Sequence, residues 1–265
     1  MKSKTGRKLL LAAALASVLA VPGSKALAQN GNMATVEGYY TGTSFTATVT
    51  SDPIVTAILS QPGTFNSKTY SSWAVLATDG TGSMELFGTM PNGYTPAVGD
   101  MLTGISGTYD PYHQIPEFED LTSLSLVSQG NSVPAIGTST IPTLNQATLP
   151  ENVAGYLWTL DNVTISGISG TFGTANLTGT ITDPGNNSMT LYYWPTSYSV
   201  ANVNLDGMAI PTGPVDMTGF VSVYNNTSPE FTPLSITPVP EPGTLAAFGL
   251  GGLLLALGMR RRSSV

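Results

Sequence analysis

The sequence predicts an all-β protein that contains two tandem copies of a small five-stranded Greek-key barrel. Charged residues make up only 9% of the chain, and there are 29 Gly and 19 Pro among 265 residues. This composition suits short strands joined by many turns. Short segments also recur in the same order in the two halves of the chain, and the second expected strand of each half is followed by turn residues.

Four short matches define the internal repeat. VEGY pairs with VAGY (from 36 and 153), TDGTGSMELF with TDPGNNSMTLY (78 and 182), TGISGTY with TGFVSVY (103 and 218), and PEF with PEF (116 and 229). Matches in a constant order indicate two copies of one fold. We therefore predict one barrel at residues 34–130 and a second at 150–237, joined by an uncharged, extended linker at 131–149.

Each copy contains five expected strands. They span 34–50, 71–79, 83–88, 103–109 and 120–127 in the first copy, and 153–167, 174–183, 188–194, 218–224 and 232–237 in the second. The Asp-Gly and Asp-Pro-Gly sequences after the second strand are typical of tight hairpin turns. An immunoglobulin-like sandwich is the structural alternative, but it needs about seven strands per copy.

The first 28 residues have the pattern of a secretory signal peptide. Four basic residues among the first eight precede an apolar run at 9–21, and Ala26 and Ala28 form a small-x-small cleavage site. Cleavage after Ala28 leaves Gln29 as the first mature residue, with 29–33 as a short segment before the first barrel. The alternative is an uncleaved membrane anchor, for which the apolar run is short. The signal implies the Sec translocon and a signal peptidase as partners.

The C-terminal segment 238–265 combines three features in a fixed order. A Pro-Glu-Pro triplet at 240–242 precedes an uncharged apolar run at 244–259, and three arginines follow at 260–262. This order predicts a single short transmembrane helix with its arginines on the cytoplasmic side. The alternative is a buried C-terminal core helix, which the consecutive arginines disfavour.

This tail resembles the PEP-CTERM sorting signal of Gram-negative bacteria. The resemblance implies that an exosortase, an integral-membrane cysteine transpeptidase, recognises the triplet and removes the tail. The protein would then be anchored in the inner membrane during processing and afterwards transferred to the cell surface or the extracellular matrix. The residues that carry the resemblance are Pro240, Glu241, Pro242, Arg260, Arg261 and Arg262.

Both predicted barrels resemble the OB-fold domains of exported bacterial nucleases and surface proteins. The first copy carries the resemblance in TDGTGSMELF and VGDMLTGISGTY, whereas the second is degenerate at the Val-Gly-Asp sequence. OB folds bind oligonucleotides and oligosaccharides across strands 2 and 3 and the adjacent loops. The resemblance therefore implies a ligand-binding role.

The distribution of charge argues against nucleic acid as the ligand. Between residues 29 and 238 the chain has one basic residue, Lys68, and fifteen acidic residues, which gives a formal charge of −14. Affinity for nucleic acid comes largely from Lys and Arg side chains that neutralise phosphates. We therefore expect no nucleic-acid partner.

Carbohydrate binding is compatible with this charge. The candidate ligand-binding residues are Tyr193 and Trp194, at the end of an expected strand, with Tyr192, Trp73 and Trp158 as further aromatic candidates. The alternative for aromatic residues in strands is packing in the core or across strands. Because side chains alternate along a strand, Tyr193 lies on the face opposite Tyr192 and Trp194.

We find no pattern of catalytic or metal-binding residues in the sequence. His113 is the only histidine and there is no cysteine, which leaves little for triad or zinc chemistry. We interpret the acidic segment around His113 as a solvated loop, with a metal or acid/base site as the alternative. In the second copy only Glu230 matches one of these acids. The acids near His113 are Asp110, Glu117, Glu119 and Asp120.

The sequence therefore predicts a non-enzymatic, exported protein of the cell surface or extracellular matrix, with exopolysaccharide as the candidate ligand. We expect no catalytic residues, no cofactor and no bound metal. The alternative is a secreted hydrolase, of glycosidase or nuclease type, or its accessory binding module. Carboxylates that converge in a deep cleft would favour the hydrolase.

Overall fold

The structure is a computed structural model that describes residues 29–65, 68–149, 153–173, 175–193, 205–225 and 227–240. The predicted signal peptide and the predicted transmembrane segment lie outside these residues. None of the helices in the described ranges is long and apolar enough to cross a membrane. Strands dominate the described chain, which confirms the expected all-β class.

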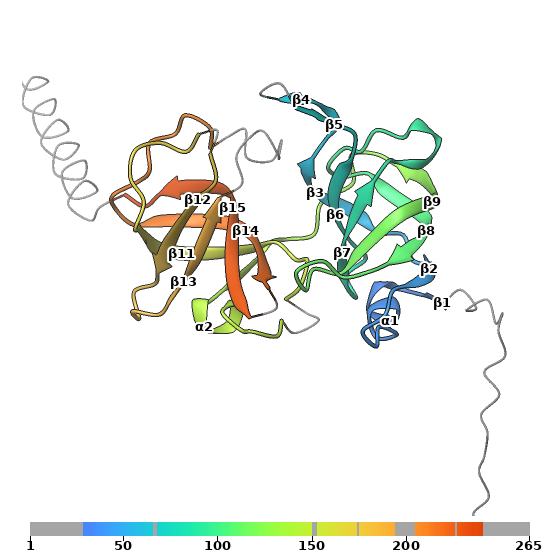
Figure 1. The fold of residues 1–265 in the computed structure, drawn as a ribbon, viewed down its shortest axis with the longest axis horizontal. Coiled ribbons are helices and arrows are strands. Elements are labelled where there is room, and N and C mark those ends of the chain that lie inside the picture. Colours follow the sequence, from blue (N-terminus) through green and yellow to red (C-terminus); the bar gives the residue numbers. More distant parts are fainter. Residues whose placement is uncertain are drawn as a thin grey trace, which may run out of the picture.

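The elements follow one another along the chain as Figure 1 shows. The first half contains β1 (Gln29–Gly31), α1 (Met33–Glu37), β2 (Phe45–Val49), β3 (Ile54–Ser60), β4 (Gly63–Phe65), β5 (Lys68–Tyr70), β6 (Trp73–Thr78), β7 (Ser83–Gly88), the 3-10 helix η1 (Pro91–Gly93), β8 (Met101–Tyr109) and β9 (Glu117–Ser128). The second half contains β10 (Gly137–Ser139), α2 (Ile141–Leu144), β11 (Trp158–Ser166), β12 (Leu177–Thr182), β13 (Ser188–Tyr193), β14 (Val215–Tyr224) and β15 (Ser228–Pro238).

Five strands of the first half close into a barrel. The order of pairing is β3-β6-β7-β9-β8 and back to β3, with β7 and β9 parallel and the other neighbours antiparallel. Strand β2 precedes β3 and continues the same side of the barrel by pairing with β8. A separate two-stranded hairpin, β4–β5, projects from this barrel (Figure 1).

The second half repeats the same ring of strands. The order is β11-β12-β13-β15-β14 and back to β11, and the β13–β15 pair is again the parallel one. In both halves the third strand therefore pairs with the fifth. This arrangement is consistent with the predicted OB-like Greek-key barrel.

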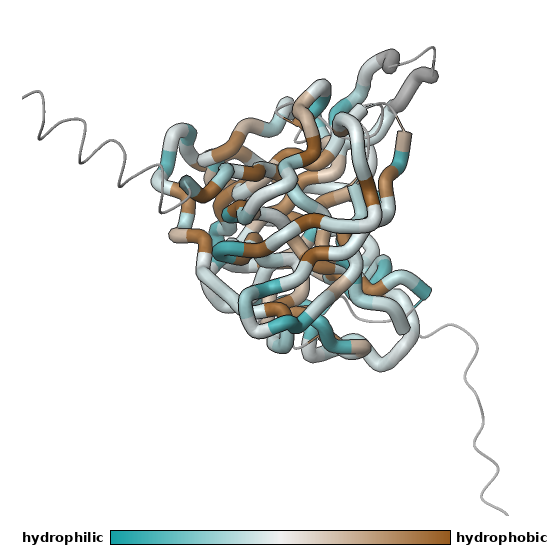
Figure 2. Tube along the Cα trace, turned by 90° about the vertical axis from the view of Figure 1, so that its left-hand side faces the viewer, coloured by the Kyte–Doolittle hydropathy of each residue, from teal (hydrophilic) through white to brown (hydrophobic). Residues whose placement is uncertain are grey.

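Alternation along the strands separates the inside of each barrel from its outside. In β7, Met84 and Leu86 are fully buried in the core of the first barrel, whereas Glu85 and Phe87 are not part of this core. Strand β13 follows the same rule, because Met189, Leu191 and Tyr193 belong to the core of the second barrel. Figure 2 shows apolar segments concentrated within the body of the molecule. The residues at outward positions do not fill the barrel cores and can therefore form the surfaces of the barrels.

The expected first strand at 34–50 is wrong over most of its length. Residues 33–37 form α1, and strand β2 begins only at Phe45. The side chain of Asn32 caps the helix by accepting a hydrogen bond from the Thr35 amide at 2.8 Å. Met33 and Val36, three residues apart, are both buried, which is a helical spacing rather than strand alternation.

The expected linker at 131–149 is only partly a connector. Strand β10 pairs in parallel with β11, with Gly137 opposite Trp158. Ile141 and Leu144 of α2 are buried in the core of the second barrel. The uncharged composition of the segment suggested an extended chain, but its few apolar residues attach it to the second barrel.

One of the four sequence matches does not represent equivalent positions. Tyr109 and Tyr224 end the matched TGISGTY and TGFVSVY segments, yet Tyr109 is 2% exposed and Tyr224 is 51% exposed. Gly107 and Gly219 are the structural counterparts. A Cβ added at Gly107 would lie 2.7 Å from the Glu119 carbonyl oxygen, and one added at Gly219 would lie 2.1 Å from the Thr232 carbonyl oxygen. Glu119 and Thr232 each follow the PEF sequence on the fifth strand of their barrel. Close approach of the two strands therefore explains these glycines.

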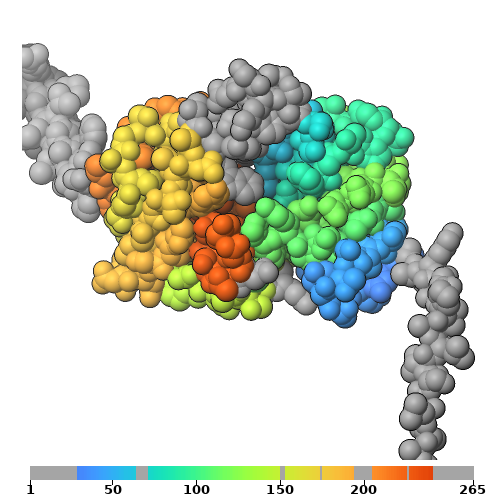
Figure 3. All heavy atoms as spheres, in the orientation of Figure 1, coloured from blue at the N-terminus to red at the C-terminus, as the bar shows by residue number. Residues whose placement is uncertain are grey.

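The two barrels are in direct contact. A shared apolar cluster joins Leu76 and Ile115 of the first barrel to Phe220 of the second. The Ser83 hydroxyl donates a hydrogen bond to the Gly155 carbonyl at 2.7 Å, and the Val223 amide donates one to the His113 carbonyl at 2.8 Å. Figure 3 shows the loop after β8 against the end of β14.

Candidate functional site: the cleft between the barrels

A cleft of about 1000 Å³ lies between the two barrels. Its first wall is formed by residues of β3, β6, β7 and β9, and its second by residues of β12, β13, β14 and β15. These walls include the second and third strands of each ring, the surface with which OB folds bind their ligands. The cleft size falls at the upper end of the usual range for small-molecule sites.

The first wall is acidic. Glu85 on β7 and Glu117 on β9 lie directly opposite one another across the parallel pair, and their side chains are only 5% and 7% exposed. Burial raises the pKa of Glu85 to about 7. Burial, together with the nearby charges of Glu85, Glu119 and Asp110, raises the pKa of Glu117 to about 8. Both carboxyls therefore tend to hold a proton near neutral pH.

The second wall is aromatic and less charged. Tyr192 lines the cleft, and its hydroxyl accepts a hydrogen bond from the Asn176 side-chain amide at 2.6 Å. Tyr224 and the buried Ser222 line it from β14, and Glu230 from β15. Burial raises the pKa of Glu230 as well. Ring faces, hydroxyls and an amide together are suitable for contacting a polyhydroxylated ligand.

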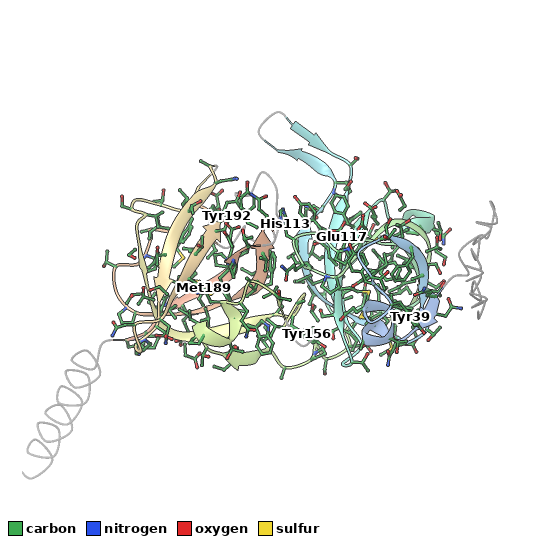
Figure 4. The ribbon with its side chains drawn as sticks, turned by 60° about the horizontal axis from the view of Figure 1, so that its bottom comes forward. Tyr39, His113, Glu117, Tyr156, Met189 and Tyr192 are labelled. Atoms are coloured by element: carbon green, nitrogen blue, oxygen red, sulfur yellow. The ribbon has the colours of Figure 1, made fainter. Side chains whose placement is uncertain are left out.

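The loop between β8 and β9 closes one end of the cleft. His113 has a positive φ of 49° and is held by the hydrogen bond from Val223 across the barrels. Its ring lies 4.1 Å from that of Tyr112 and 5.6 Å from that of Tyr224, measured between centroids. Figure 4 shows His113, Glu117 and Tyr192 on the sides of the barrels that face each other.

The predicted aromatic residues occupy different environments. Tyr193 is fully buried, with its ring 5.0 Å from that of Phe172, and therefore has no face to offer to a ligand. Trp194 lies outside the described residues. Trp73 packs against the core of the first barrel and Trp158 against that of the second. Of the candidates in the described ranges, only Tyr192 lines the cleft.

The interpretation of the acids near His113 as a solvated loop is wrong for two of them. Glu117 and Glu119 belong to strand β9 and line the cleft, because the second barrel covers this face. Asp120 is exposed, as expected for a solvated acid. Within the described part of the chain, no three His, Cys, Asp or Glu residues are grouped so that they could hold a metal ion.

Two signals in the sequence could have located the cleft. The repeated PEF places Glu117 and Glu230 at equivalent positions, one in each barrel, and both line the cleft. The alternation of Met189, Leu191 and Tyr193 with smaller or polar residues assigns Tyr193 to the core. Glu85 carries no comparable signal, because its burial depends on contact with the second barrel.

The sorting residues begin where the second barrel ends. Strand β15 ends at Pro238, and the exposed Pro240 follows two residues later. The other predicted sorting residues, Glu241, Pro242 and Arg260–Arg262, lie outside the described residues, as do Ala26 and Ala28 of the predicted cleavage site. Gln29 begins β1 and pairs with Ala47 of β2.

Comparison with protein families identifies the tail. Residues 238–262 match the family model described as the PEP-CTERM protein-sorting motif. The sorting motif predicted from the Pro-Glu-Pro triplet, apolar run and arginines is thus confirmed. The motif implies an exported protein that is processed by an exosortase. A comparison of the chain with curated proteins found no match.

Solved structures resemble the chain only distantly. A murine DNA-binding protein bound to double-stranded DNA is 15% identical, with 72% of this chain and 98% of that chain covered and a TM-score of 0.35. The tetrameric p202 HIN2 is 11% identical, with 69% and 87% covered and a TM-score of 0.32. At these TM-scores the likenesses carry no argument.

Proposed function

We propose that this chain is an exported protein of the cell surface or extracellular matrix that binds exopolysaccharide in the cleft between its barrels. The matched sorting motif supports export and processing. Removal of residues 1–28 by signal peptidase, transient anchoring by a helix at 244–259 and release near Pro240 complete the proposed route.

The observation that carries the proposal is the meeting of two OB-like binding faces in one cleft. Each barrel contributes residues of its second and third strands, such as Phe87 in the first and Tyr192 in the second. OB folds bind oligosaccharides or oligonucleotides with this surface, and the charge of −14 between residues 29 and 238 disfavours nucleic acid. Aromatic rings beside hydroxyls and amides provide stacking and hydrogen bonds for sugar rings.

Binding can be tested by titrating the full chain with polysaccharide from the matrix of its native host. Tyr192→Ala should weaken binding about tenfold, because a stacking contact of about 1.4 kcal/mol is lost. Tyr39→Ala is the matched control, since Tyr39 is 40% exposed and does not line the cleft. Equal losses in both variants, or no binding by the unmodified chain, would contradict the proposal.

Processing can be tested separately by intact mass. Chain recovered from the cell-associated and secreted fractions of the native host should begin at Gln29 and end near Pro240. A mass that still includes Val265 in every fraction would mean that the tail is retained, and the proposed release by exosortase would be wrong.

Glycoside hydrolysis is a second candidate, favoured by the carboxyls that converge in the cleft. Glycosidases use two carboxyl groups, one of which is protonated and acts as the general acid. Glu117 has a raised pKa suited to the acid, and Glu230 lines the cleft from the other barrel. The test is release of reducing ends from matrix polysaccharide by the full chain. Release of reducing ends by the unmodified chain, abolished in Glu117→Gln, would establish the hydrolase. If the unmodified chain releases no reducing ends, binding remains the proposed function.

A further inference from the structure

The charged residues of the cleft are acidic. Glu85, Glu117, Glu119 and Glu230 line it, and no lysine or arginine is found among its described lining residues. His113 is the single basic side chain in this set. The rest of the chain offers little compensation, because Lys68 is the only lysine or arginine between residues 29 and 238. Among the described lining residues only His113 could supply a positive charge, so a ligand is the other source of a cation for these carboxyls.

Two of these acidic side chains are largely buried in the wall of the cleft. Glu85 and Glu117 are more than nine-tenths buried, lie side by side on β7 and β9, and line the cleft. Neither carboxyl forms a hydrogen bond with another described residue. Burial of an unpaired carboxyl is unfavourable above all in its charged form, so both groups favour their protonated forms until a cation binds beside them. A protein that used this surface only for packing would be more stable with apolar residues at both positions.

Aromatic rings that line the cleft supply what a sugar ring with a positive charge requires. The rings of Tyr112 and His113, on the loop of the first barrel, are neighbours of Tyr224 on the second wall, with centroid distances of 4.1 Å for Tyr112–His113 and 5.6 Å for His113–Tyr224. Tyr192, oriented by Asn176, extends this wall on β13. Aromatic faces attract cations as well as the apolar faces of sugars. An acidic wall and an aromatic wall thus face each other across one cleft.

We infer that the cleft selects a cationic polysaccharide whose sugar units carry free amino groups. The ammonium group binds between Glu85 and Glu117, and the sugar ring stacks on the wall formed by Tyr192 and Tyr224. This inference rests on the proposed function and adds the chemical class of the ligand. An ammonium group has three donors and can satisfy both carboxyls at once. An N-acetylated sugar offers no charge and a single amide donor.

The test compares two oligosaccharides of equal length, a glucosamine oligomer with free amines and its N-acetylated form. Calorimetric titration of the full chain near neutral pH, at about pH 7 where the carboxyls can ionise, should give about tenfold tighter binding of the free-amine oligomer, equivalent to about 1.4 kcal/mol. The double variant Glu85→Gln/Glu117→Gln should lose this preference and still bind the N-acetylated oligomer. The matched control is Asp52→Asn/Asp161→Asn, which removes the same charge at two exposed positions away from the cleft.

Each other outcome overturns the inference in a recognisable way. Equal binding of both oligomers contradicts selection of a cation and leaves polysaccharide binding standing. The same loss of preference in the control double variant contradicts a site at Glu85 and Glu117, because overall charge would then explain the preference. Binding of spermine but of neither oligomer contradicts the polysaccharide class together with the proposed function. Circular dichroism and thermal melting of each variant establish that it is folded.

Discussion

The two barrels share a ring of strands but differ on the faces that meet. The β6–β7 pair and the β12–β13 pair form the same hairpin in the two halves, with Ser83 and Ser188 at the start of the third strand. Glu85 in the first barrel is replaced by Thr190 in the second. The core positions of this strand remain apolar in both copies, namely Met84, Leu86, Met189 and Leu191.

The comparison shows which positions the fold requires and which it leaves free. Inward positions must stay apolar because they fill a closed barrel. The residue types at outward positions are constrained only by what packs against them, and here each barrel covers part of the other. The first barrel contributes the buried acids, and the second contributes Tyr192 and Tyr224. Divergence of the facing surfaces thus gives the pair a cleft that neither barrel forms alone.

The largest expected effect concerns the equivalent core residues Phe118 and Phe231. Both are fully buried, and replacement of either by Ala should lower the free energy of unfolding by about 3–5 kcal/mol. Because the cluster of Leu76, Ile115 and Phe220 joins the barrels, we expect a single unfolding transition in both variants. Calorimetry checks this. Two transitions, of which only one shifts, would show that the barrels unfold independently.

A smaller effect is a dependence of folding stability on pH, which should originate in the first barrel. The pKa values of Glu85 and Glu117 are raised from 4.5 to about 7 and about 8, so the folded state favours their protonated forms. The resulting stabilisation is complete below pH 4.5 and is lost as pH rises through 7 and 8. Thermal melts should show Tm decreasing as pH rises from 4.5 to above 8.

The double variant Glu85→Gln/Glu117→Gln is the control for this pH dependence. It should remove most of the decrease in Tm, because glutamine does not titrate. Thr190, the counterpart of Glu85, does not titrate either. Among the described acidic residues of the second barrel, Glu230 is the one whose pKa is raised. A decrease that persists unchanged in the double variant would assign the pH dependence to other groups.

The smallest effect distinguishes two equivalent serines. Ser83 is 1% exposed and donates a hydrogen bond to Gly155 across the barrels. Ser83→Ala should therefore cost about 1 kcal/mol. The Ser188 side chain is exposed and shares a hydrogen bond with the Thr182 side chain, at 2.9 Å, so Ser188→Ala should change stability little. The urea concentrations at the midpoints of unfolding measure both effects. Equal midpoints for Ser83→Ala and Ser188→Ala would show that the Ser83–Gly155 hydrogen bond does not stabilise the protein.

Local chemistry made much of the fold predictable. The Asp-Gly turn and the alternating SMELFG segment define β6 and β7 at 73–78 and 83–88, inside or equal to the expected bounds. The first strand was mispredicted because the local helix cap formed by Asn32 was not recognised. The burial of Val36 depends in addition on packing against the core of the first barrel. Strand β3 was missed because its residues carried no match in the repeat.

The site was less predictable than the fold. Glu117 was singled out with the acids near His113, but its burial requires the second barrel and appears in no local pattern. Tyr193 was chosen from its residue type, although alternation with Met189 and Leu191 places it in the core. The sorting motif was predictable throughout, because it is read as a linear sequence and needs no fold.

The end of β15 at Pro238 limits how far the protein can stand from a membrane. A chain spans at most about 3.6 Å per residue, so the six residues from Pro238 to the predicted helix at 244 reach about 20 Å. Strand β15 pairs with β14 along its whole length, so its residues do not extend this reach. Under the proposed anchoring by residues 244–259, the second barrel would therefore lie close to the lipid surface before release. A processing enzyme would have to work in a gap narrower than the protein that it releases.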